Sequence, residues 1–254
     1  SDFDEKVSIE FDHVTFVYPD GEEPVLQDVS FKANKGEMIA FIGSTGSGKS
    51  TLVNLVPRFY DVSSGSIKIN GKDIRDYDVL ELRDKLGVIP QKAVLFSGTI
   101  ADNIRFGKKD ASDEEVEYAA KVAQAYPFIM EKENGFDEEI SEGATNVSGG
   151  QKQRLSIARA LVRKAQIYIF DDSFSALDFK TDAILRKELK KEMTESIMLV
   201  VAQRISSIME ADQIIVLNEG KVVGKGTHHQ LLKECQIYHE IATSQLSEEE
   251  LANA

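Results

Sequence analysis

Hydrophobic and polar residues alternate along the first part of the chain, with the two-residue period of a β-strand that has one buried face. The hydrophobic positions of this stretch are Ile9, Phe11, Val14, Phe16 and Tyr18. The turn sequence Pro19-Asp20-Gly21 ends the alternation, and a second short strand is predicted at 29–33. We therefore expect these two segments to pair as an antiparallel sheet.

Further along the chain, hydrophobic residues form four short continuous runs, which are typical of strands buried on both faces. These runs are residues 38–42, 167–170, 197–201 and 214–217. Helical stretches separate the last three runs, which is the pattern of a parallel sheet with crossover helices. We also expect a helix from Lys49 towards Phe59 and a closing hairpin at Val222-Val223.

Between residues 100 and 162 the hydrophobic spacing becomes helical, with Gly107, Pro127 and Gly135 as interruptions. This segment is predicted to form a helical lobe inserted into an α/β core. The expected organisation is a single domain, 1–254. Its parts are an antiparallel β subdomain with the α/β core (1–91 and 165–246), a helical subdomain (92–164) and a polar tail (247–254).

Composition adds little to this picture but excludes some functions. The 254 residues carry a net charge of −13, which argues against a nucleic-acid surface. Acidic residues gather between Lys108 and Glu142, most simply as a solvated helical face. Cys235 is the only cysteine, so no internal disulfide can form and a reducing compartment is expected. No hydrophobic run approaches the ~20 residues that span a bilayer.

Residues 43–50 form a glycine-rich loop between a buried strand and a predicted helix. Their sequence, Gly-Ser-Thr-Gly-Ser-Gly-Lys-Ser, fits the phosphate-loop pattern in the context that this pattern requires. Backbone N–H groups would surround phosphate oxygens, Lys49 would contact the β- and γ-phosphates, and the Ser50 hydroxyl would bind Mg²⁺. The alternative is a plain glycine-rich turn. The nucleotide-binding residues predicted here are Gly43, Ser44, Thr45, Gly46, Ser47, Gly48, Lys49, Ser50 and Thr51.

Two polar residues stand at the ends of predicted strands, where open α/β sheets present ligand-binding groups. Asp171 ends the run 167–170 and is expected to coordinate Mg²⁺, unless it serves as a helix N-cap or turn residue. Gln91 follows residues 86–90, and its side-chain oxygen could reach Mg²⁺ or an attacking water. Taken alone, Gln91 could equally be a surface loop residue.

A second glycine motif, Ser148-Gly149-Gly150-Gln151, stands about a hundred residues after the first. Ser-x-x-Gln is a capping box, and a helical hydrophobic pattern follows it. A capped helix that begins with two glycines also presents free N–H groups and the positive end of its dipole to an anion. Both roles are compatible, so this motif predicts a helix start that can bind phosphate.

Together these motifs resemble the nucleotide-binding domain of an ATP-binding-cassette (ABC) transporter, from Ile9 to about Leu246. The resemblance implies a P-loop (RecA-like) parallel-sheet core, ATP and Mg²⁺ as ligands, and a dimer. In this family the Ser148–Gln151 motif binds the γ-phosphate held by the opposite subunit. Val147 replaces the leucine that usually precedes this motif. The segments 58–61, 64–67 and 95–100 are similar to exporters of multidrug, peptide and lipid type.

The resemblance assigns three further roles. Tyr18 stands where the family has an aromatic residue that stacks on adenine, although a surface aromatic of a strand is the alternative. Asp178 ends the D-loop Ser175-Ala176-Leu177-Asp178, which follows the dimer interface. Glu142 stands where exporters have a glutamate loop facing the membrane domain, but its flanking residues differ from the usual ones.

Two residues depart from the family pattern, and both serve hydrolysis. Asp172 replaces the glutamate that activates or orients the attacking water, and Gln203 replaces the histidine that contacts the γ-phosphate. Asp172 is one methylene shorter, and a displacement of about 1 Å can cost on the order of a hundredfold in rate. Gln203 can donate a hydrogen bond but cannot carry a proton. Slow hydrolysis is therefore expected, unless Asp172 acts through a water.

Similar replacements occur in the degenerate site of heterodimeric exporters. We therefore expect this chain to form the weak site and to complete a competent site on a second nucleotide-binding domain, which belongs to a different chain. A membrane domain outside this segment would anchor it at the cytoplasmic face of the membrane, with no nucleic-acid partner. The alternatives are a regulatory module with negligible turnover and a fully active homodimeric exporter domain. ABC proteins of chromosome or translation type would need a coiled-coil insertion or a second cassette.

Overall fold

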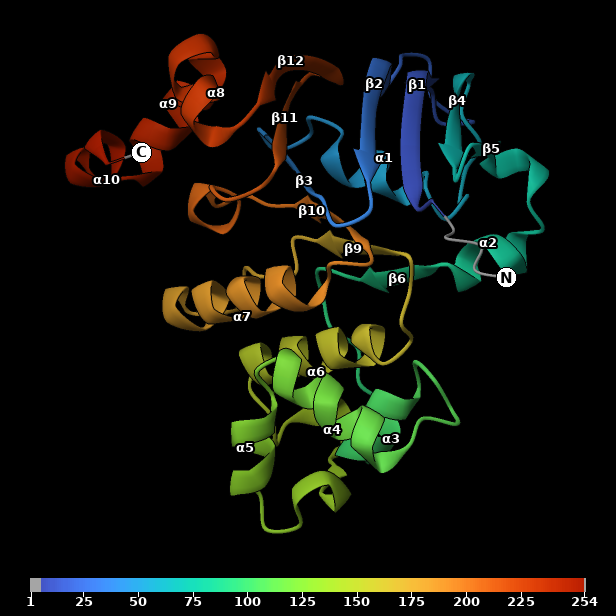
Figure 1. The fold of residues 1–254 in the computed structure, drawn as a ribbon, viewed down its shortest axis with the longest axis vertical. Coiled ribbons are helices and arrows are strands. Elements are labelled where there is room, and N and C mark those ends of the chain that lie inside the picture. Colours follow the sequence, from blue (N-terminus) through green and yellow to red (C-terminus); the bar gives the residue numbers. More distant parts are fainter. Residues whose placement is uncertain (1–5, 254) are drawn as a thin grey trace.

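The computed structural model describes residues 6–253, which form two main β-sheets and a group of helices (Figure 1). The strands are β1 (Ser8–Phe16), β2 (Leu26–Asn34), β3 (Met38–Gly43), β4 (Ser64–Ile69), β5 (Lys72–Asp73), β6 (Leu86–Ile89), β7 (Gly98–Thr99), β8 (Glu139–Ile140), β9 (Ile167–Asp171), β10 (Ile197–Val201), β11 (Gln213–Asn218) and β12 (Lys221–Gly226). The α-helices are α1 (Lys49–Asn54), α2 (Val79–Asp84), α3 (Ile100–Arg105), α4 (Asp113–Val122), α5 (Tyr126–Glu131), α6 (Gly149–Leu161), α7 (Phe179–Glu192), α8 (His228–Glu234), α9 (Gln236–Gln245) and α10 (Glu248–Ala252). Short 3₁₀ turns lie at Ile74–Asp76, Gly135–Asp137, Glu142–Ala144 and Ile205–Ser207.

The central sheet has six strands in the order β12-β11-β3-β10-β9-β6. All neighbours are parallel except β12, which pairs antiparallel with β11. Strand β10 is buried along its whole length, as its continuous hydrophobic run predicts. Because the strands are parallel, the ends of β3, β9 and β10 meet at one edge, where Val201 pairs with both Phe41 and Asp171. This edge carries the predicted phosphate loop.

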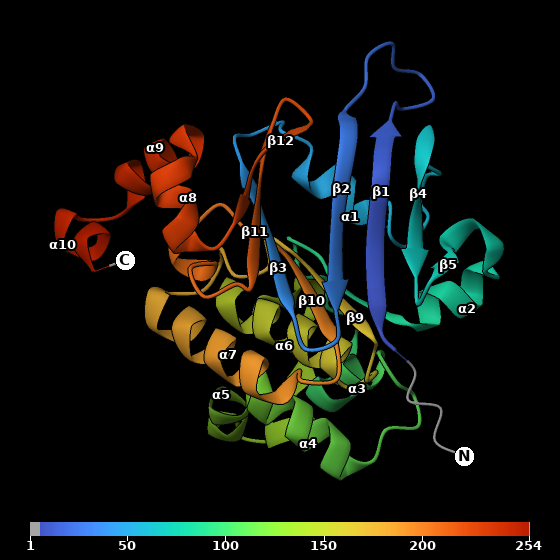
Figure 2. The same cartoon turned by 45° about the horizontal axis from the view of Figure 1, so that its top comes forward.

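The predicted antiparallel sheet is present, with β1 paired to β2 and β4. Phe11 pairs with Phe31, and their rings stack with centroids 4.6 Å apart. The inner face of this sheet shares a hydrophobic core with α1 and with one face of the central sheet. Figure 2 shows this sheet beside the central sheet, on the side away from the helices α3 to α6.

Helices α3 to α6 lie on the other side of the central sheet, where α6 contacts β6, and α7 lies beside them (Figure 1). A second core joins these helices to that face and contains Phe170 and Val200 from the strands and Leu155 from α6. The helical spacing does not reveal the two-stranded sheet of β7 and β8, which interrupts the helices. The predicted α/β architecture with a parallel core, an antiparallel sheet and inserted helices is confirmed.

Two details at helix ends differ from the sequence pattern. Helix α1 ends at Asn54, before the expected Phe59, because Pro57 disfavours helical geometry in the preceding residue and Arg58 adopts a φ of 57°. The polar end of the chain contains α10, which Ser247 caps and whose Leu251 packs against the core. Over residues 6–253, no helix has the length and hydrophobicity needed to cross a membrane.

Candidate nucleotide-binding site

The phosphate loop connects β3 to α1 at the carboxyl edge of the central sheet. Gly46 and Gly48 have φ values of 79° and 100°, which L side chains rarely adopt. A Cβ on Gly43 would lie 2.2 Å from the Leu217 carbonyl oxygen, so only glycine fits beside β11. The chain therefore turns tightly enough to direct backbone N–H groups towards one space, as the motif predicts.

Lys49 is the first residue of α1 and is buried. Its Nζ donates a hydrogen bond of 2.8 Å to the carbonyl oxygen of Gly43, which holds the ammonium over the loop. Burial lowers the pKa of Lys49, and the nearby carboxylates of Asp172 and Asp171 oppose this shift. The loop thus contains a poorly solvated positive charge, which suits an anion such as a triphosphate.

Ser50 and Asp171 are brought together from α1 and β9. The Ser50 hydroxyl donates a hydrogen bond of 2.9 Å to Oδ1 of Asp171. Burial raises the pKa of Asp171, while the Ser50 hydrogen bond and the charge of Lys49 lower it. A hydroxyl and a carboxylate oxygen beside a phosphate loop are the donors that Mg²⁺ prefers, so these residues fit the ion.

Asp172 lies next to this pair and is only 8% exposed. Its backbone has a φ of 52°, and its N–H donates to the carbonyl oxygen of Val201 at 2.8 Å, which fixes the residue to β10. The Gln91 side-chain amide donates a hydrogen bond of 3.1 Å to Oδ2 of Asp172. Burial raises the pKa of Asp172, while Lys49 is the main group that lowers it. Gln91, Asp171 and Asp172 thus form one polar cluster.

Gln203 lies two residues beyond β10 and is exposed. Its carbonyl oxygen accepts a hydrogen bond of 2.7 Å from the Gln245 side chain. The next residue, Arg204, donates to the carbonyl oxygens of Phe174 and Leu177 and to the buried Asp182. Arg204 therefore ties the Gln203 segment to the loop that follows Asp172. Nothing in the sequence pattern had singled out this role of Arg204.

Tyr18 lies beside the phosphate-loop helix. Its hydroxyl and that of Thr51 form a hydrogen bond of 2.8 Å. The ring meets Phe16 and Tyr60 edge to face, with centroids 4.8 Å and 5.3 Å away. Tyr60 is 44% exposed, so this aromatic group is open to a flat ligand on one side. Sequence reasoning missed Tyr60, although its neighbours at 58–61 were noted for their family resemblance.

Ser148 to Gln151 begin helix α6 on the helical subdomain. The capping box is present, because the Ser148 hydroxyl accepts from the Gln151 N–H and the Gln151 side chain accepts from the Ser148 N–H, both at 3.1 Å. A Cβ on Gly149 would meet no atom within 4 Å, so the space beside this residue is open. No hydrogen bond among residues 6–253 joins this motif to the phosphate loop, so the two motifs are separate surfaces of the chain.

Asp178 is used locally as the N-cap of α7. Its carboxylate accepts hydrogen bonds from the backbone N–H and the hydroxyl of Thr181, at 2.8 Å and 2.9 Å. These hydrogen bonds lower the pKa of Asp178. A Cβ on Gly150 would lie 3.3 Å from the carbonyl oxygen of Ala176, so the loop before Asp178 lies against the start of α6. Glu142 is exposed in a 3₁₀ turn.

Comparisons with known proteins agree with this site. The family model described as ABC transporter matches residues 26–175. An uncharacterized ABC transporter ATP-binding protein of Mycobacterium tuberculosis is 47% identical over 234 residues, 91% of this chain and 40% of that protein. A putative multidrug export ATP-binding/permease protein of Staphylococcus aureus is 44% identical over 237 residues, 93% of this chain and 41% of that protein.

The solved structure of a bacterial Atm1-family ABC exporter with ATP bound superimposes with a TM-score of 0.91 at 38% identity. It covers 96% of this chain, which in turn covers 43% of the exporter chain. The chain therefore spans about two-fifths of the length of the relatives it matches.

Proposed function

This chain belongs to the ABC transporter family, and from that premise we propose that it is the ATP-binding, energy-coupling domain of an exporter whose own site hydrolyses ATP slowly. The observation that carries this proposal is the position of Asp172. Asp172 immediately follows Asp171, and Gln91 donates a hydrogen bond to its carboxylate. It occupies the position at which the family has the longer glutamate that reaches the attacking water.

ATP would bind with its phosphates in the loop 43–50 and its base against the aromatic group of Tyr18 and Tyr60. The Lys49 ammonium is held over the loop by its hydrogen bond to the Gly43 carbonyl oxygen. It would move to the phosphates at little cost, because it would exchange a neutral carbonyl acceptor for a charged phosphate oxygen. Mg²⁺, held by Ser50 and Asp171, would neutralise phosphate charge. Gln91 would complete this polar shell. Binding therefore has all of its expected groups.

Hydrolysis lacks two of its groups. A general base must come within about 3 Å of the proton that it accepts, and Asp172 is short by one methylene. Its Oδ2 already accepts a hydrogen bond from Gln91, and its backbone is fixed to Val201, so the carboxylate has little freedom to advance. Gln203 supplies no charge to the transferred phosphate. Both features oppose the catalytic step and leave nucleotide binding intact.

A second nucleotide-binding domain is the proposed partner. The start of α6 borders open space beside Gly149, and its capping box includes no residue of this chain's own phosphate loop. The N–H groups of this helix start would receive the γ-phosphate held by the partner, with Asp178 and its loop along the interface. The intact capping box supports a competent site on the partner, and this asymmetry favours a heterodimer over a homodimer.

A membrane domain is the other proposed partner. A groove of about 290 Å³ opens between β6, α6 and the residues that follow α3, and its walls include Phe59 and Phe106, which are 55% and 60% exposed. Pro90, which precedes Gln91, also lines the groove. A segment of the membrane domain seated in this groove would contact the residue next to Gln91, which supports coupling of transport to the site at the cytoplasmic face. A purely regulatory module would not need such a coupling surface.

The proposal is tested by comparing binding with turnover in the same preparation. A fluorescent ATP analogue should saturate the chain in the presence of Mg²⁺, while phosphate release stays far below the ~10 per second typical of enzymes. Sedimentation with ATP, with and without added salt, reports the dimer fraction, because the charge of −13 on each copy opposes self-association. Rapid release from the unaltered site would contradict the proposal.

A further inference from the structure

A large cavity lies at the edge of the sheet opposite the phosphate loop. Its volume is about 690 Å³, within the range of small-molecule sites. Gln166 and Ser196 on its wall immediately precede β9 and β10, so the cavity lies at the amino ends of these strands. The nucleotide site lies at their carboxyl ends, so the cavity is a separate feature and the proposed function gives it no role.

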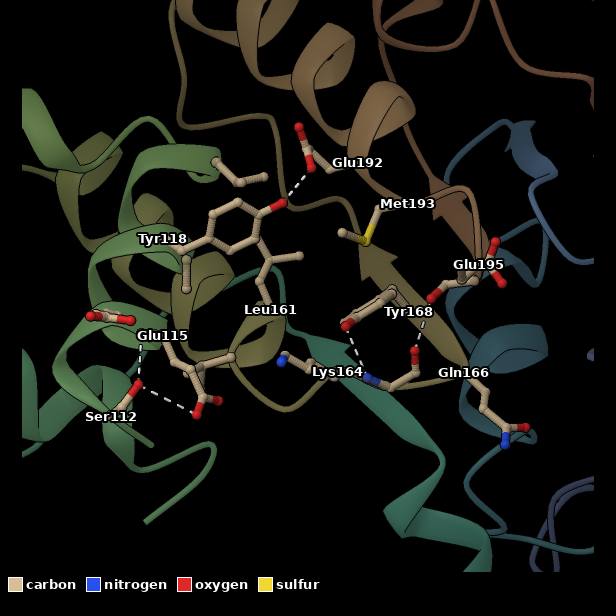
Figure 3. A pocket seen from close by; sticks show the side chains of 16 residues that line it. Ser112, Glu115, Tyr118, Leu161, Lys164, Gln166, Tyr168, Glu192, Met193 and Glu195 are labelled. Carbon is tan, nitrogen blue, oxygen red and sulfur yellow. Dashed lines mark hydrogen bonds between the residues drawn. The ribbon is translucent and has the colours of Figure 1, made fainter. Parts of the chain in front are cut away.

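The cavity is formed by two parts of the fold that meet there. Helix α4 supplies Tyr118 and Val122, the end of α6 supplies Leu161, and the end of α7 and the residue after it supply Glu192 and Met193. Figure 3 shows Tyr118, Leu161, Glu192 and Met193 around one hollow, with the Tyr118 ring above Leu161. A ligand here would therefore touch both the helical subdomain and the core.

The interior of the cavity is hydrophobic and partly aromatic. Tyr168 contributes its ring, and its hydroxyl is already engaged as the acceptor for the Ala165 N–H at 2.9 Å. Tyr118 is 53% exposed. Such walls bind a hydrophobic body and offer an aromatic face to a positive charge.

The charges of the wall are mostly negative. Four glutamates line the cavity, and Lys164 is the one basic residue that lines it among the described residues. Lys108 pairs with Glu115 at 2.7 Å, and Lys35 forms an ion pair with Glu195. Within residues 6–253, no ion pair engages Glu114 or Glu192. Two carboxylates without a basic partner thus remain beside the hydrophobic walls.

Glu192 and Tyr118 define the polar end of the cavity. The Tyr118 hydroxyl donates a hydrogen bond to the Glu192 carboxylate from across the hollow, as the dashed line in Figure 3 marks. This hydrogen bond, with partial burial and the charges of Glu192 and Glu188, raises the pKa of Tyr118 to about 12. The negative potential is therefore concentrated where an aromatic ring and a carboxylate meet.

We propose that this cavity binds a lipophilic organic cation, with its charge beside the Tyr118 ring and the Glu192 carboxylate and its hydrophobic body against Leu161, Val122 and Met193. An anion of the same shape would face Glu192 and Glu114 and would be excluded. A neutral hydrophobic molecule would leave the two carboxylates uncompensated. The bound cation would connect α4 to α7 and restrain the helical subdomain against the core.

Two probes of equal shape and opposite charge test the proposal. Tetraphenylphosphonium should bind the chain with one-to-one stoichiometry in a calorimetric titration, with or without saturating Mg-ATP, and tetraphenylborate should not. Tyr118→Leu and Glu192→Gln should each weaken binding by about fivefold or more. Glu131→Gln, which removes an exposed charge from the end of α5, is the matched control and should leave the affinity unchanged.

Hydrogen exchange provides a readout independent of affinity. Tetraphenylphosphonium should slow exchange in the last turn of α7 and in α4, and this protection should disappear in the Glu192→Gln variant. Equal binding of the two probes would overturn the proposal, as would unchanged affinity in both cavity variants when thermal unfolding shows that they are folded. Protection confined to the phosphate-loop edge would also overturn it.

Discussion

The Gln91 amide donates a 3.1 Å hydrogen bond to the Asp172 carboxylate, and so joins the second residue after β6 to the residue that follows β9. Gln91 begins the segment that leads into the helical subdomain, and Pro90 before it lines the groove proposed for the membrane domain. Asp172 is therefore held by a residue that movement of this segment would displace. The hydrogen bond connects the residue proposed to slow hydrolysis to the surface where transport is proposed to be coupled.

Removing the charge of Asp172 should stabilise the protein at neutral pH. Burial raises the pKa of Asp172 above the ordinary 3.8, so its ionised form costs folding free energy as the pH rises through the folded-state pKa. Asp172→Asn should raise the free energy of unfolding by about 1 kcal/mol at pH 7.5, a Tm increase of roughly 2–4 °C. The gain should shrink towards pH 4, as followed by calorimetry. A gain equal to that of the exposed Asp20→Asn would contradict this explanation.

Replacing Lys49 should remove most of the nucleotide affinity. Its ammonium is the cation that the loop holds in place through Gly43, and a charge-assisted hydrogen bond contributes about 1.5–3 kcal/mol. Lys49→Ala should therefore weaken binding of a fluorescent ATP analogue by roughly 10- to 100-fold. Lys187→Ala, on the exposed face of α7, serves as the charge-matched control. Equal affinity of the two variants for the ATP analogue would contradict the assignment of residues 43–50 as the phosphate-binding loop.

The aromatic group at Tyr18 and Tyr60 should determine how well the base is held. Base–aromatic stacking contributes about 1–3 kcal/mol, so Tyr18→Ala should weaken ATP binding by about fivefold or more. Tyr18→Phe keeps the ring and loses only the hydrogen bond to Thr51, so its affinity should stay within about twofold. Binding of inorganic triphosphate should be the same in all three proteins. A loss of triphosphate binding would assign Tyr18 to loop structure instead.

Stability should fall at mildly acidic pH through His228. Its Nδ1 and the Tyr238 hydroxyl share a hydrogen bond, and its Nε2 is buried with no partner among the described residues. Burial, with a smaller effect of His229, lowers the pKa of His228 below 6.5. The neutral ring is therefore favoured by folding, and this stability is lost as the pH falls below 6.5.

The unfolding midpoint of His228→Asn, measured from pH 7.5 to 5.0, should fall less than that of the unaltered chain. His13 shifts in the opposite direction because Asp28 raises its pKa, so His13→Asn is the control. If the unfolding midpoint of His228→Asn falls as much as that of the unaltered chain over this range, His228 is not the cause of the acid destabilisation.

The sequence was most informative where a local rule fixes geometry. Continuous hydrophobic runs identified β3, β9 and β10, and Ser-x-x-Gln identified the cap of α6, because both depend on near neighbours. The bond between Gln91 and Asp172 joins residues 81 positions apart and was not predictable from spacing. Tyr60 and Arg204 were missed for the same reason, since their contacts arise only when separate segments pack. The expected helix after Lys49 was longer than the observed α1, because Pro57 ends the helix earlier than the hydrophobic spacing indicates.

The most direct measurement is phosphate release by the chain with Asp172→Glu and Gln203→His together, at matched ATP occupancy and dimer fraction. The longer carboxylate should reach the attacking water and the imidazole should contact the γ-phosphate, so turnover should rise about tenfold or more over the unaltered chain. ATP affinity should stay within about twofold, since Lys49, Ser50 and Asp171 are unchanged. An unaltered chain that already releases phosphate as fast as the double variant would contradict the account of a binding site that hydrolyses slowly.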